Sequence, residues 1–111
     1  MGLFRRNKNI KKPVIRQIID LVPRWMIESC TKKHKSDKGC SRYKTYDQFV
    51  ALTYGQLNKC YTLNDISTGI GVSETFISDL GLNQSPARST MSDGNKKRDW
   101  KVFESLYYKV L

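Results

Sequence analysis

Apolar residues recur at helical spacing along most of the chain, and prolines, glycines and polar segments separate them. Directly after Pro13 the apolar positions are Val14, Ile15, Ile18, Ile19 and Val22. This spacing predicts a short amphipathic helix, which Pro23 must end or kink. Pro23 is also suited to the first position of a second helix, which we expect to run to about His34.

The most apolar segment covers residues 45–57 and follows a polar, basic loop. Thr45 precedes Gln48 by three residues, which is the pattern of a capping box at a helix start. The apolar residues of this segment are Phe49, Val50, Leu52, Tyr54 and Leu57. We therefore expect a helix here that is central to the core.

Two more helix starts follow, one at Thr62 with Asp65 and one at Ser73, and Gly81 is a suitable helix stop. The stretch LNDISTGIGVSETFISDL, residues 63–80, also fits a helix-turn-helix. In that pattern Gly71 lies at the turn, Val72 follows it, and the inward positions are Ile66, Ile77 and Leu80. An ordinary helical hairpin is the alternative that the pattern leaves open.

The last two helices are predicted from polar caps. Ser85 as the cap and Pro86 in the first turn predict a helix to about Asn95, with Ala87 and Met91 toward the core. Asp99 is the expected cap of the last helix, whose apolar residues are Trp100, Phe103, Tyr107 and Val110. We find no alternating run that predicts a strand. The fold class is therefore all-α: a bundle of six or seven short helices over residues 13–111, preceded by a flexible basic arm at residues 1–12.

The charge of the chain changes the picture, because 20 Lys and Arg face 10 Asp and Glu, for a net charge of +10. Residues 1–44 hold 13 basic and 3 acidic residues, whereas residues 45–111 hold 7 of each. Such an excess indicates a polyanionic partner, either a nucleic acid or an anionic membrane surface. No apolar run is long enough for a membrane span, so we expect a soluble protein. We expect it to be cytoplasmic, with double-stranded DNA rather than a membrane as its partner.

Metal and enzyme chemistry have little support in the sequence. Three cysteines without a CxxC indicate reduced thiols rather than a secreted disulfide framework. Cys30, His34, Cys40 and Cys60 could supply soft ligands, but their spacing matches no known zinc motif. We expect no metal, no cofactor, no small-molecule substrate and no catalytic residue in this chain.

The helix expected at residues 85–95 is the better candidate to recognise DNA. The helix at residues 73–80 would bring Glu74 and Asp79 toward phosphates and has no basic residue. Arg and Asn side chains can bond base edges bidentately, and Ser can bond bases or phosphates. The candidate DNA-binding residues are Arg88, Ser89, Ser92, Asn95, Lys96, Lys97, Arg98 and Lys101, with Arg5, Arg6, Lys8, Lys11 and Lys12 of the arm.

The stretch RSTMSDGNKKRDWKVFE, residues 88–104, resembles the segment RSTL-x-x-A-N-x-x-R-x-W-x-x-[FY] in the amino-terminal domain of bacterial insertion-sequence transposases of the IS-four type. QIIDLVP, YKTYDQFVALTYGQL and TLNDI are similar to that domain in the same order. The resemblance implies a helical DNA-binding module and places Arg88, Ser89, Thr90, Asn95 and Arg98 at motif positions. Gly94 departs from the pattern, since Ala is usual there.

The resemblance also implies a function for the chain. In that family the module precedes a ribonuclease-H-like domain with a metal-binding acidic triad, and this chain ends at Leu111, before such a domain. We therefore expect a non-catalytic domain that recognises terminal inverted repeats in DNA transposition. We expect it to be associated with the nucleoid, and both a monomer and a homodimer are compatible with the sequence. The alternatives are a free-standing helix-turn-helix regulator and a protein-interaction module that pairs transposase subunits.

Overall fold

A computed structural model describes residues 13–40 and 42–111, and these form seven α-helices and no strand. The helices are α2 (Val14–Ile19), α3 (Arg24–His34), α4 (Thr45–Leu57), α5 (Leu63–Ile70), α6 (Glu74–Asp79), α7 (Arg88–Lys97) and α8 (Lys101–Val110). The all-α prediction is confirmed. The basic arm at residues 1–12 lies outside the described residues.

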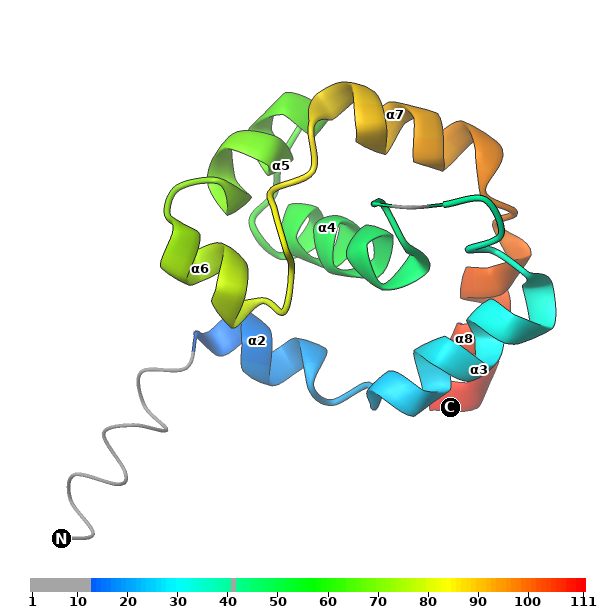
Figure 1. Ribbon diagram of the computed structural model, residues 1–111. Coiled ribbons are helices and arrows are strands. Elements are labelled where there is room, and N and C mark those ends of the chain that lie inside the picture. Colours follow the sequence, from blue (N-terminus) through cyan, green and yellow to red (C-terminus); the bar gives the residue numbers. More distant parts are fainter. Residues whose placement is uncertain (1–12, 41) are drawn as a thin grey trace, which may run out of the picture.

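Helix α4 lies in the middle of the molecule, and the other helices surround it (Figure 1). Val50 and Ala51 of α4 are fully buried, and α4 packs against α2, α3 and α5. Helix α3 also packs along α8, and α5 packs against α7. The prediction that the segment at residues 45–57 is central to the core is confirmed.

Local capping residues begin α5 and α6 as the sequence predicted. The Asp65 backbone N–H donates to Thr62 Oγ1 at 3.1 Å, and the Thr62 N–H donates to Asp65 Oδ2 at 3.3 Å. The Ser73 hydroxyl accepts from the Phe76 N–H at 3.0 Å. Gly81 has φ +78°, which a residue without Cβ adopts without strain, and the chain leaves α6 there.

The expected capping box of α4 is wrong by one residue. Lys44 is the cap, and its N–H donates to Asp47 Oδ2 at 2.9 Å. The Thr45 N–H instead donates to Asp37 Oδ1 at 2.6 Å, because the preceding loop folds back over the start of the helix. Gln48 is buried and bonds to other elements rather than to the helix start.

The start of α7 also differs from the prediction. The Ser85 hydroxyl donates to the Ser67 carbonyl of α5 at 2.8 Å, so it caps no helix, and α7 begins three residues later at Arg88. Ala87 is exposed rather than buried, whereas Met91 is 1% exposed, as expected for a core residue.

Helix α8 buries a different face from the one expected. Trp100, Tyr107 and Val110 are exposed, and the buried residues of α8 are Val102 and Leu106. The reason is that α3 lies along this second face. Asp99 does contribute at the start of α8, since its Oδ1 accepts from the Lys101 N–H at 3.0 Å.

Candidate nucleic-acid interface

Helix α7 is fixed to the core along one side. Met91 packs in the hydrophobic core, and Asn95 Oδ1 accepts from Gln48 Nε2 of α4 at 2.8 Å. Asn95 was expected on the exposed side with Arg88, and it is exposed, although this hydrogen bond ties its side chain to α4. The inner side of α7 therefore holds the helix in a defined orientation.

The other side of α7 carries four of the candidate residues. Arg88, Ser89 and Lys96 are exposed, and Ser92 is half-buried. Residues 88, 92 and 96 are successive i, i+4 neighbours, and residue 89 is three positions before 92, so all four share one side of the helix. We call Arg88, Ser89, Ser92 and Lys96 the outer face of α7.

Arg98 occupies a different environment from the other candidates, because its side chain is only 3% exposed. Its guanidinium donates to the carbonyls of Ser36 at 3.2 Å and Tyr43 at 2.6 Å, and to Gln48 Oε1 at 2.6 Å. It also lies 3.6 Å from an Asp37 carboxylate oxygen. Arg98 thus joins the end of α7 to the loop before α4, and it is not available to a ligand from solvent.

Gly94 lets the Tyr43 ring lie close against α7. A Cβ built at Gly94 would lie 2.6 Å from Cε2 of the Tyr43 ring, which is too short for real atoms. Burial raises the pKa of Tyr43 to about 12, and its hydroxyl is buried without a hydrogen-bond partner among the described residues. The glycine that departs from the transposase pattern therefore makes room for this ring.

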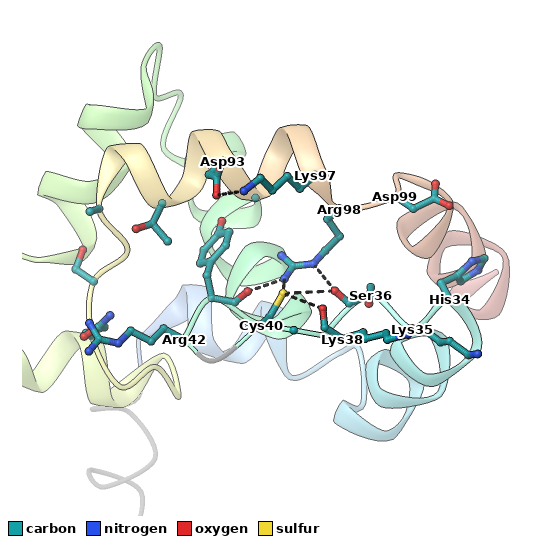
Figure 2. Close-up of a pocket in the computed structure, with 17 residues that line it drawn as sticks. His34, Lys35, Ser36, Lys38, Cys40, Arg42, Asp93, Lys97, Arg98 and Asp99 are labelled. Carbon is teal, nitrogen blue, oxygen red and sulfur yellow. Dashed lines mark hydrogen bonds and ion pairs between the residues drawn. The ribbon is translucent and has the colours of Figure 1, made fainter.

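A cleft of about 840 Å³ lies beside α7. We use the name cationic loop for residues 35–40, 42 and 43, all of which except Asp37 line one wall of the cleft. The other wall includes Thr90, Gly94 and Lys97 of α7. Figure 2 shows Lys35, Lys38 and Arg42 on the loop side, opposite Lys97 on α7. Sequence reasoning noted this loop as basic but did not include its residues in the site.

The acidic residues at the cleft already have partners. Asp93 pairs with Lys97 at 3.1 Å on α7, where both side chains are well exposed. Asp99 accepts from the first N–H of α8. Lys101, the first residue of α8, is exposed. The candidate residues of the arm lie outside the described part of the chain: Arg5, Arg6, Lys8, Lys11 and Lys12.

Helix α6, the competing candidate for a recognition helix, has six residues and no cation. Glu74 is exposed in its first turn, and the Asp79 carbonyl accepts from Arg16 at 2.7 Å. Phosphates would meet a carboxylate on this helix. The charge of α7 is the more favourable for a nucleic acid.

The candidate soft ligands do not come together as a site. Within residues 13–40 and 42–111, no three His, Cys, Asp or Glu side chains form a group that could hold a metal ion. Cys30 is buried and free, and the His34 ring bonds to the Ser105 hydroxyl at 2.6 Å. In the same part of the chain, no helix is both long and apolar enough to cross a membrane.

A family model described as a domain of unknown function, DUF4372, matches residues 10–83, which is well over half of the chain. The chain belongs to the DUF4372 family. In this DUF4372 protein the matched residues include α2 to α6, whereas α7 and α8 follow the matched part. No curated protein and no solved structure matches the chain.

Proposed function

We propose that this DUF4372 protein binds duplex DNA through the outer face of α7. The observation that carries the proposal is the division of α7 into two sides. Met91 in the core and the hydrogen bond from Gln48 to the exposed Asn95 fix the helix, while the outer face presents Arg88, Ser89, Ser92 and Lys96 to solvent. A helix fits the major groove of B-DNA, which is roughly 12 Å wide. Arg88 can then bond a guanine edge bidentately, and Lys96 can neutralise a phosphate.

We further propose that this binding serves DNA transposition. The sequence of α7 and the start of α8, RSTMSDGNKKRDWKVF, resembles the motif of IS-four-type transposase amino-terminal domains. On this proposal the domain recognises terminal inverted repeats, and strand cleavage belongs to a catalytic domain that these residues do not form. The chain itself acts without catalysis and without a cofactor.

A protein-interaction module is the second candidate function, and one observation favours it. Trp100, directly before α8, and Tyr107 of α8 are large aromatic side chains that lie exposed on the surface. Exposed aromatic residues are typical of protein interfaces. This candidate predicts association that depends little on salt, whereas DNA binding depends on it steeply.

Fluorescence anisotropy of a labelled duplex at 50 and 200 mM salt separates these functions. If four basic side chains each neutralise one phosphate, log K falls with log salt with a slope of roughly −3.6, so the fourfold increase in salt weakens binding roughly 150-fold. Duplex binding that is absent at 50 mM salt, or equal at both concentrations, would remove the DNA-binding proposal.

A further inference from the structure

The cationic loop carries charge that the described part of the protein does not neutralise. Lys38 and Arg42 are exposed, as is Lys35, and none of the three side chains has an ion-pair or hydrogen-bond partner among the described residues. Of the acids that line the same cleft, Asp93 forms an ion pair with Lys97, and Asp99 accepts a hydrogen bond from the Lys101 N–H. The loop side of the cleft is therefore suited to an anion.

Backbone hydrogen bonds set the spacing of the loop cations. The Lys38 N–H donates to the Lys35 carbonyl at 3.2 Å, which closes a β-turn and brings the ends of that turn to within roughly 7 Å. The next turn is closed by the Cys40 N–H, which donates to the Asp37 carbonyl at 3.0 Å. Two successive turns therefore hold the lysines close together on one wall.

Arg98 holds the loop beside α7. Its guanidinium bonds to the carbonyls of Ser36 and Tyr43, which lie near the two ends of the loop, and it pairs with Asp37 between them. Because Arg98 directly follows the last residue of α7, the loop and the helix form one structural unit. Figure 2 shows the guanidinium between the two walls of the cleft.

We propose that the cleft receives the phosphodiester backbone of one DNA strand, whose phosphates Lys35, Lys38 and Arg42 neutralise. This inference rests on the proposed function. When a helix lies in the major groove, a sugar-phosphate backbone borders it on each side, and the cleft lies along one side of α7. The loop contacts set the register of α7 on the duplex and are indifferent to base sequence. Arg98 is a positioning residue for the loop.

The test compares two double variants that remove the same charge. Lys38→Gln with Arg42→Gln changes the cleft, whereas Lys59→Gln with Lys109→Gln changes exposed lysines that do not line it. Duplex binding is measured between 50 and 200 mM salt. Loss of two phosphate contacts should lower the salt slope by roughly 1.8, so the cleft variant should be about 12-fold less sensitive to this salt change than the wild type.

The control variant should keep a slope close to that of the wild type, and neither variant should change the preferred sequence. A cleft variant with the wild-type slope, or a control that loses as much slope, would overturn the inference while the DNA-binding proposal stands. Failure of the wild type to bind any duplex would overturn both.

The positioning role of Arg98 is tested with Arg98→Lys, which keeps the charge but loses the planar fork of donors. We expect this variant to lose salt slope as the cleft variant does, with an unchanged circular dichroism spectrum at the assay temperature. A folded Arg98→Lys protein with the wild-type slope would contradict the positioning role, and the Lys38 and Arg42 pair tests the cleft independently of it.

Discussion

Arg98→Ala should destabilise the fold strongly, although the residue lies within a basic cluster of the sequence. The guanidinium is 3% exposed and bonds to two backbone carbonyls and to Gln48, besides its ion pair with Asp37. Alanine removes all of these donors at once. The carbonyls of Ser36 and Tyr43 and the Asp37 carboxylate would then lose a partner in a half-buried position.

The size of the effect follows from these contacts. Removing one partner of a buried ion pair costs roughly 3–5 kcal/mol. The Asp37 side chain is 26% exposed and keeps its hydrogen bonds to Thr45, so we expect the lower end, about 3 kcal/mol. For a domain of this size, each kcal/mol lowers the melting temperature by roughly 4 °C, which gives a decrease of about 12 °C.

Thermal and urea unfolding followed by circular dichroism measure this difference. Lys97→Ala is the matched control, because it removes the neighbouring cation, which is 76% exposed in a surface ion pair. Exposed ion pairs contribute less than about 1 kcal/mol, so the control should melt close to the wild type. An Arg98→Ala protein within about 1 kcal/mol of the wild type would refute the assignment of Arg98 as a buried anchor.

Two further predictions concern the contact between Gly94 and Tyr43. Gly94→Ala should destabilise the protein by about 1 kcal/mol in urea unfolding, because the cost of overpacking against the Tyr43 ring exceeds the gain of roughly 1 kcal/mol in helix propensity. In a Tyr43→Ala background the ring is absent, so the same change should stabilise the protein. A stabilising effect with Tyr43 present would contradict the close contact. Tyr43→Phe should keep full stability at pH 7, because the hydroxyl has no hydrogen-bond partner among the described residues. Burial raises the pKa of Tyr43 from 10.0 to about 12, so the folded state favours the protonated hydroxyl. The stability that Tyr43 contributes is therefore fully present below pH 10 and is lost as the pH rises toward 12. The melting temperature of the wild type should therefore fall more steeply between pH 10 and 12 than that of the phenylalanine variant. Equal falls in melting temperature would argue against the raised pKa of Tyr43.

The starts of α5 and α6 and the position of the central helix could be predicted from the sequence. Thr62 with Asp65 and Ser73 begin α5 and α6 through hydrogen bonds that span three residues. The apolar run at residues 45–57 identified the central helix, because few of its faces could be left in water. These predictions needed no knowledge of distant partners.

Features that depend on distant residues could not be predicted in this way. Ser85 is a good helix cap by residue type, but its hydroxyl bonds to Ser67 of α5. On α8, Val102 and Leu106 are four residues apart and compete with the stripe that includes Trp100, so the packing of α3 decides which face is buried. Local spacing does not contain this information.

The candidate site shows the same division. The spacing of α7 in the sequence placed Arg88, Ser89, Ser92 and Asn95 on one exposed side, and the structure exposes all of them except Ser92, which is half-buried. It gave no signal that Arg98 is buried, because the partners Ser36 and Gln48 lie 62 and 50 residues away. A basic cluster in a sequence contains both ligand-binding and structural cations, and only the tertiary contacts distinguish them.

Selection of binding sites from a pool of random duplexes, with wild-type protein and with Arg88→Ala, tests most directly whether the outer face of α7 recognises DNA sequence. We expect the wild type to enrich one motif. Arg88→Ala should bind that motif about 1–3 kcal/mol more weakly and lose its preference at one base pair, with an unchanged melting temperature. Enrichment of the same motif with the same affinity by the variant, or a changed motif only in Thr75→Ala and Ser78→Ala of α6, would contradict the account.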